Sequence, residues 1–473
     1  MQEAWRHGTA GASFGGMKSR SWLGLTALLA LVTPAAAAPD DPLAAFDKEV
    51  DALFVQGGLT SDQAASRAGT ASPTVRRKAA EVDASIASAE AAELARVPQV
   101  GAKVVYTRLS PIDPLMFGTI AIPFLNNSYV AEANVNVNLS DYIVKYPKLV
   151  EAAKLAEEVA KVSRKSSEVD AGEDARLAYY EWVRARLQVL VSAHQLVQVR
   201  GTLKQVQALA DAQRVSKADL MRVQSQEAEA EQVADQLQNL AALREEQLRI
   251  LIGASADEKL GLGEDIRTVV TAGTAESLEA ALGKAKQTRL DFKTLDVGIE
   301  AKDKQTQSEK ANQYPRLSAF AVVDEARPNP RIFPQADEFK LTWQVGAQIT
   351  WTLNDNLISK TTEKRLRAET NELRSDRESL ERGARLQILA AQQAVALAQH
   401  ALTTSAKGLA AAAEGYRVRQ ALLAAERATG VELVDAETDL TRARIAALNA
   451  RVDLRVAMTQ LAHALGTDVA KRP

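Results

Sequence analysis

The sequence predicts a mainly helical fold that also contains a two-sided β-sheet, and three observations lead to this class. Only 5% of the 473 residues are aromatic and alanine is abundant, which suits long helices better than mixed α/β cores. Leu366, Leu373 and Leu380 recur at a seven-residue step, as in a coiled coil. In contrast, residues 341–353 alternate strictly between apolar and polar, which is typical of a strand with two different faces.

Charge and composition exclude several classes of function. Lys plus Arg number 58 and Asp plus Glu number 60, so the basic excess of a nucleic-acid-binding protein is missing. The chain has no cysteine, which excludes disulfides, thiolate metal sites and cysteine catalysis. Its four histidines are far apart in sequence, and no phosphate loop or nucleophile elbow is present. We therefore expect no enzyme activity, no cofactor and no metal.

Residues 1–37 are expected to be a signal peptide. Two basic residues precede a short apolar run (22–32), which a proline and four alanines follow. This is the order of a secretory signal, with cleavage near Ala37 or Ala38, and Met17 is a candidate start. The apolar run is short for a membrane anchor, and no later stretch of about 20 apolar residues follows. The sequence thus predicts an exported protein.

The rest of the chain is predicted to be a duplication with an offset of about 215 residues. Four landmarks recur in the same order: Arg96–Gln99 and Gln313–Arg316, Leu139–Asp141 and Leu353–Asp355, Arg214–Ser216 and Arg427–Thr429, and Ile252–Gly253 and Leu465–Gly466. The two repeats are 38–253 and 275–466. Residues 254–274, rich in Gly, Asp and Thr, form a connector, and 467–473 form a tail.

Each repeat is expected to contain a helix, two strands, a very long helix and a last helix. The first helices are 44–96, with a break near Pro73, and 275–313; the long helices are about 145–212 and 357–425; the last helices end at Gly253 and Gly466. A helix of about 70 residues spans roughly 105 Å. The last helix of one repeat, stacked on the first helix of the next, has a similar length, so one long helix can lie beside two shorter ones.

The strand at 341–353 has the alternation of a membrane β-barrel. Its odd positions are apolar and include Trp343 and Trp351, whereas its even positions are Thr, Gln or Gly. The two tryptophans are roughly 26 Å apart along an extended strand, which suits the aromatic girdles at the two membrane surfaces. A half-buried sheet in a soluble domain is the less favoured alternative.

The strand at 129–139 repeats this pattern. It begins with Tyr129, a third candidate lipid-facing aromatic, and places three asparagines on its polar face, which suits a water-filled lumen. Weaker strands are expected at about 100–109 and 317–324. Four strands cannot close a barrel, and open edges in lipid cost several kcal/mol for each unpaired backbone group. Several chains must therefore share one barrel; three chains of four strands would supply 12 strands, and two would supply eight.

These features together resemble the outer-membrane efflux protein (TolC) family. The most similar stretches are Arg214–Leu220, Glu414–Arg419, Arg427–Glu437, Leu251–Gly253 and Leu461–Gly466. The resemblance implies a homotrimer with a 12-stranded barrel in outer-membrane lipid and duplicated long-helix hairpins that form a periplasmic α-barrel. It implies the channel of a tripartite efflux pump, docked to a periplasmic adaptor protein and an inner-membrane pump. The alternatives are the exit duct of a type I secretion system and an exported coiled-coil protein without a pore.

The breaks after the two long helices are expected to be the periplasmic tips that meet the adaptor. The residues concerned are Gln213, Arg214, Ser216, Lys217 and Asp219 in the first tip, and Glu426, Arg427 and Thr429 in the second. The family usually has a glycine before the arginine, where this chain has Gln213 and Glu426. The spacing of Ser216 to Asp219, and of Thr429 to Glu432, also fits a capping box that starts the returning helix.

Glu432 and Asp435 match the two acidic positions that ring the narrow periplasmic entrance in the family. They are three residues apart and share one helix face. Threefold symmetry would gather about six carboxylates around one axis, and such a ring attracts cations. The alternative is that Glu432 only caps the helix and that Asp435 is a solvated surface charge.

Overall fold

The computed structural model describes residues 42–122, 124–268 and 276–468 of the chain. The expected signal peptide lies outside the described residues, as do residues 269–274 of the connector and 469–473 of the tail. Two units are distinguished. They are Met1–Ala45, of which the start of α1 (Pro42–Leu53) is described, and Phe46–Pro473, to which the following paragraphs refer.

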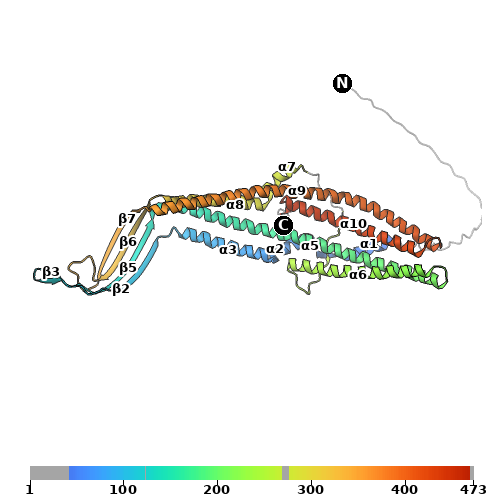
Figure 1. Ribbon diagram of the computed structural model, residues 1–473, viewed down its shortest axis with the longest axis horizontal. Helices are drawn as coiled ribbons and strands as arrows, with labels where there is room; N and C mark the ends of the chain where they lie inside the picture. Colours follow the sequence, from blue (N-terminus) through green and yellow to red (C-terminus); the bar gives the residue numbers. More distant parts are fainter. Residues whose placement is uncertain (1–41, 123, 269–275, 469–473) are drawn as a thin grey trace, which may run out of the picture. The chain divides into compact units, whose positions relative to one another are not determined.

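The two halves of the chain share one order of elements: two helices, two sheet strands, one very long helix and a last helix (Figure 1). The first half contains β1 (Phe54–Leu59), α2 (Ser61–Ala71), α3 (Pro73–Leu94), β2 (Gln99–Arg108), β3 (Leu115–Phe117), β4 (Ile120–Ile122), β5 (Asn127–Asn138), α4 (Leu139–Ile143), α5 (Tyr146–Asp211) and α6 (Lys217–Ile252). The second contains α7 (Leu278–Thr288), α8 (Leu290–Lys310), η1 (Ala311–Gln313), β6 (Arg316–Arg327), β7 (Lys340–Thr350), α9 (Leu353–Ala424) and α10 (Gly430–Ala464).

Each long helix packs against a series of shorter helices. The 66-residue α5 contacts α6 along one part and α2 and α3 along another, and the 72-residue α9 likewise contacts α10, α7 and α8. The helices α6 and α10 return from the ends of α5 and α9, so each half forms a hairpin whose tip lies far from the strands (Figure 1).

The stacked helices belong to the same half, so the expectation that the last helix stacks on the first helix of the next repeat is wrong. Gly253, which ends α6 with φ +64°, lies so close to α2 that a Cβ there would be 2.7 Å from the Cβ of Ala71. Gly466, after α10, has φ +67°, and a Cβ there would be 2.9 Å from the backbone nitrogen of Arg289. Glycine thus provides both the left-handed cap and the close contact in each half.

The expected first helices are also wrong in extent. The predicted helix 44–96 is interrupted by β1, although α3 does begin at Pro73. The strand forms because the Leu59 N–H donates to the Gly261 carbonyl at 2.8 Å and the Gly263 N–H donates to the Leu59 carbonyl at 2.9 Å. These partners lie in the connector, beyond the reach of a local pattern.

The predicted helix 275–313 is two helices, with the break at Arg289. The backbone of this residue is extended, with φ −72° and ψ 132°. Its guanidinium pairs with Asp291 at 2.6 Å and also donates to the Ala464 carbonyl at 3.3 Å. Neither proline nor glycine stands here, so the sequence carries no local signal for the break.

The sheet has the strand order β2–β5–β6–β7, and each neighbouring pair is antiparallel. The register aligns the apolar residues of all four strands. Val100, Val135, Ala321 and Val345 form one row across one face, whereas Lys103, Glu132, Asp324 and Thr342 form a row across the other. The predicted strand 341–353 is too long, because β7 ends at Thr350 and α9 already begins at Leu353.

The apolar face of the sheet is exposed. The exposed fraction is 84% for Val104, 68% for Val345 and 73% for Ile349. On the polar face Lys103 pairs with Glu132 at 2.9 Å, and the Thr342 hydroxyl donates to Asp324 at 2.9 Å. Most of the exposed apolar surface of the sheet therefore lies on one face.

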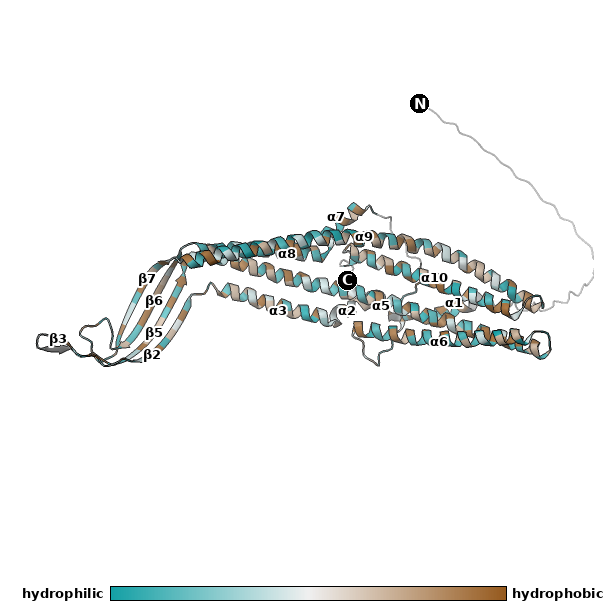
Figure 2. Cartoon of the chain, viewed as in Figure 1, coloured by the Kyte–Doolittle hydropathy of each residue, from teal (hydrophilic) through white to brown (hydrophobic). Residues whose placement is uncertain are grey.

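The main hydrophobic core lies where α1, α5, α6 and α10 meet. Tyr179, Trp182 and Leu187 of α5 are buried there with Leu248 of α6 and Val452 of α10. Nearer the sheet, α8 and α9 are mostly hydrophilic (Figure 2), and ion pairs such as Lys302–Glu369 and Arg377–Asp296 join them. No helix within the described residues is both long and apolar enough to cross a membrane.

Candidate functional site

The two hairpin tips have the same backbone conformation. Gln213 and Glu426 have positive φ values of 57° and 56°. In the first tip the Arg214 N–H donates to the Leu209 carbonyl, and in the second the Arg427 N–H donates to the Leu422 carbonyl, each at 2.8 Å. This is the Schellman helix end, whose left-handed residue is usually glycine. The tips thus have the turn that usually contains glycine, but Gln213 and Glu426 occupy the left-handed position.

The returning helices begin with hydroxyl caps. Ser216 Oγ accepts from the Asp219 N–H at 3.1 Å, and Thr429 Oγ1 accepts from the Glu432 N–H at 3.2 Å. The two acidic side chains are engaged elsewhere: Asp219 accepts from the Ser216 hydroxyl at 2.7 Å, and Glu432 pairs with Arg419. The caps of the predicted capping boxes are present, but the carboxylates make other contacts.

Polar contacts link the two hairpins near their tips. Arg214 pairs with Glu426 at 2.5 Å, and the Gln226 amide donates to Asp435 at 3.4 Å. An open groove of about 360 Å³ lies between the loops. Its lining comprises Leu209, Arg214, Val215, Leu423, Glu426, Arg427, Ala428, Thr429 and Glu432. Arg427, in the groove lining, and Lys217, at the start of α6, are both exposed, and neither forms an ion pair with another described residue.

Both acidic residues of the predicted entrance ring are exposed on α10. They differ in their partners. Glu432 is held by the guanidinium of Arg419 in the same hairpin, whereas Asp435 accepts from the neutral amide of Gln226 and forms no ion pair with another described residue. Asp435 therefore carries the less compensated charge. Neither Arg419 nor Gln226 was recognised in the sequence, because each belongs to a different helix from its partner.

A buried carboxylate lies deeper between the hairpins. Glu437 of α10 is only 1% exposed, and the Thr202 hydroxyl of α5 donates to its Oε1 at 2.9 Å. Burial raises the pKa of Glu437 to about 7, against the smaller effect of the Thr202 hydrogen bond. Two turns earlier, a Cβ on Gly430 would be 2.2 Å from a methyl group of Val206, so α5 and α10 pack closely here. The sequence offered no signal for this residue.

Aromatic residues gather at both ends of the sheet. Near the loops, the rings of Tyr129 and Tyr106 have centroids 5.0 Å apart, and the ring of Phe339 is 6.3 Å from that of Tyr129. Trp343 of β7, four residues after Phe339, is 68% exposed. Near the helices, Trp351 lies beyond β7 and its indole N–H donates to the Gln313 carbonyl at 3.3 Å. Tyr142, Tyr146 and Tyr314 lie at the same end. These tyrosines and Phe339 were missed in the sequence because they come from separate strand ends.

Among the described residues, no group of three His, Asp or Glu side chains is placed to hold a metal ion. No protein-family model and no curated protein matches the sequence.

Several solved structures match the fold of nearly the whole chain. The outer-membrane channel OprN has a TM-score of 0.72 and 16% identity, over 92% of this chain and 97% of its own. The outer membrane protein VceC from Vibrio cholerae has a TM-score of 0.70 and 16% identity, over 86% of this chain and 96% of its own. The open outer membrane channel MtrE from Neisseria gonorrhoeae has a TM-score of 0.70 and 16% identity, over 86% of this chain and 88% of its own. The chain therefore has the fold of these outer-membrane channels, which confirms the mainly helical class with a small sheet.

Proposed function

We propose that the protein is an outer-membrane channel that passively conducts substrates from the periplasm to the exterior. The observation that carries this proposal is the sheet, with one largely apolar exposed face and a more polar opposite face. An apolar surface of this kind is unfavourable in water unless another apolar surface contacts it. Membrane lipid provides this contact, and no specific protein partner is needed. The fold shared with outer-membrane channels supports the same function.

The sheet also supports assembly as a homotrimer. The strands β2 and β7 are its two edges and each has one neighbour, so half of their backbone groups point outward. In lipid each unpaired group costs several kcal/mol, and a closed barrel removes that cost. Strands of 10 to 12 residues suit a membrane barrel, and three copies of four strands would supply 12. The helical hairpins would then surround a periplasmic tunnel.

Fractionation and gel migration test this function. We expect the mature protein in the outer-membrane fraction, as a species that migrates as a trimer when unboiled and as a monomer after boiling. Recovery as a periplasmic monomer would contradict the channel and would favour an exported coiled-coil protein.

The tips are proposed to dock a periplasmic adaptor of a tripartite efflux pump. The open groove between the loops and the exposed cations Lys217 and Arg427 at the tips support this role. Replacing both Lys217 and Arg427 with glutamate is expected to abolish export in cells while trimer levels stay normal, because neither cation holds an ion pair that the fold needs. Drug susceptibility and unboiled gels measure the two effects.

Lys407→Glu provides the matched control for this double variant, because Lys407 is exposed on α9 away from the tip loops. Export at the native level is expected for it. Site-specific crosslinking from position 217 provides a second readout. If export is normal in the Lys217 and Arg427 variant and no periplasmic partner is crosslinked, the tips are not the docking site.

Glu432 and Asp435 are proposed to ring the periplasmic entrance and to favour cations. Because Glu432 is compensated by Arg419, we expect Asp435→Asn to reduce cation preference more than Glu432→Gln does. Single-channel recording in planar bilayers measures selectivity and the block by multivalent cations from the periplasmic side. If selectivity and block are unchanged in the double variant, neither carboxylate lines the entrance. Glu432 is then only a residue at the capped start of α10, and Asp435 is a solvated surface charge.

A further inference from the structure

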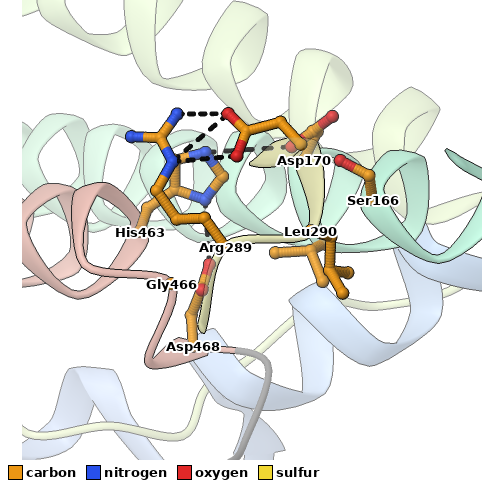
Figure 3. A pocket seen from close by; sticks show the side chains of 9 residues that line it. Ser166, Asp170, Arg289, Leu290, His463, Gly466 and Asp468 are labelled. Carbon is orange, nitrogen blue, oxygen red and sulfur yellow. Dashed lines mark hydrogen bonds and ion pairs between the residues drawn. The ribbon is translucent and has the colours of Figure 1, made fainter. Parts of the chain in front are cut away.

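Three segments far apart in sequence meet at a small cavity (Figure 3). Ser166 and Asp170 come from α5, Arg289 from the break between α7 and α8, and His463 and Asp468 from the end of α10 and the residues after it. The cavity has a volume of about 130 Å³. The first segment belongs to one half of the chain and the other two to the second half.

Both ring nitrogens of His463 face carboxylates. Nδ1 is 2.9 Å from Asp468 Oδ2, and Nε2 is 3.1 Å from Glu173 Oε2 and 3.8 Å from Asp170 Oδ1. A neutral imidazole has a proton on only one nitrogen and would turn a lone pair toward a carboxylate at the other. Only the imidazolium donates on both sides. The geometry is therefore that of a protonated histidine.

The charged groups around the ring are mostly acidic. Helix α5 contributes Asp170, Glu173 and the exposed Asp174, and Asp468 is 8% exposed with one oxygen, Oδ1, that lacks a hydrogen-bond partner. At the break between α7 and α8, Asp291 is compensated by Arg289. Loss of the proton from His463 would leave the remaining carboxylates around a neutral ring.

The pKa shifts agree with this geometry. Burial alone lowers the pKa of His463, but the hydrogen bond to Asp468 and the charges of Glu173, Asp468 and Asp170 raise it above its usual value. Burial also raises the pKa of Asp170 and of Glu173, against the charge of His463. A raised pKa means that the folded state binds the proton more tightly than the unfolded state does.

We propose that His463 is a proton-sensitive clasp, which fastens the C-terminal end of α10 to α5 when protonated and loosens this contact when it loses its proton. The clasp joins the two halves of the chain and does not depend on the proposed channel function. Its contribution to stability is complete below the usual pKa of histidine, about 6.5, and is lost as the pH rises through the raised pKa. The raised pKa values of Asp170 and Glu173 add a contribution of the same sign at lower pH.

Amide hydrogen exchange of the full-length protein in detergent tests the clasp. The readout is the protection of residues 460–468, corrected for the intrinsic pH dependence of exchange, from about pH 5.5 to about pH 8.5. We expect protection to fall across this range in the native protein and to stay level in His463→Gln. Each unit by which the pKa is raised corresponds to about a tenfold change in the equilibrium between the fastened and the loosened contact.

His400→Gln is the matched control, because His400 is exposed on α9 and should leave the pH profile of this segment unchanged. His194 cannot produce the same trend: burial and Arg444 lower its pKa, so its contribution is lost as the pH falls. An unaltered profile in His463→Gln would overturn the proposal.

A second variant keeps the test decisive if His463→Gln folds poorly. Asp468→Asn keeps the shape of the side chain but removes its charge, so the midpoint of the native profile should move to lower pH. A midpoint that does not move would overturn the clasp.

Discussion

Replacing Val345 with arginine is expected to remove the assembled protein from the outer membrane. Val345 lies in the middle of β7, is 68% exposed and faces the same side of the sheet as its cross-strand neighbour Ala321. In the proposed barrel this side contacts lipid, where an arginine near the midplane costs about 2–4 kcal/mol in each chain. Three copies carry the cost together, so the unboiled trimer should be nearly lost from outer-membrane fractions.

Gln348→Arg is the matched control on the same strand. Gln348 lies on the polar face opposite Ser318, so its charge would point into water and trimer levels should stay normal. Ile349→Arg, on the apolar face but one residue from the end of β7, should cause a smaller loss than Val345→Arg. Equal trimer levels in all three variants would show that the faces are assigned wrongly or that the sheet does not meet lipid.

Glu437→Gln is expected to stabilise the protein strongly above neutral pH. In the native protein the buried carboxyl has its pKa raised from 4.5 to about 7. Its protonated form therefore contributes stability that is complete below about pH 4.5 and is lost as the pH rises through about 7. The shift corresponds to roughly 3 kcal/mol of folding stability that the native protein loses at high pH. The glutamine variant does not lose this stability, because glutamine is neutral at every pH.

Thermal unfolding at about pH 5 and about pH 9 measures this effect. The native protein should lose more stability between the two values than Glu437→Gln does, and the variant should be the more stable of the two at the higher pH. Glu229→Gln, an exposed site on α6, should follow the native protein. If the native protein and Glu437→Gln lose equal stability, Glu437 is ionised in the fold at neutral pH.

The candidate site was only partly readable from the sequence. The alternation in β7 correctly placed Trp343 on the apolar face, because side chains of a strand alternate whatever the strand packs against. The same alternation predicted a strand that is too long. Trp351 lies beyond the end of β7, and its indole N–H donates to the Gln313 carbonyl. At the tips, the sequence identified the caps Ser216 and Thr429 but not the ion pair of Arg214 with Glu426, which joins two loops 212 residues apart.

By itself, the sequence determined the kinds of elements and the faces that they present. Helical and strand periods arise within a few residues, and so do the glycine ends at Gly253 and Gly466. Only the tertiary structure decided which elements meet: β1 with the connector, α6 with α2 of its own half, and His463 with Asp170 and Glu173. Such contacts depend on how whole helices pack, and packing is set by shape and charge summed over many side chains, which no local pattern in the sequence contains.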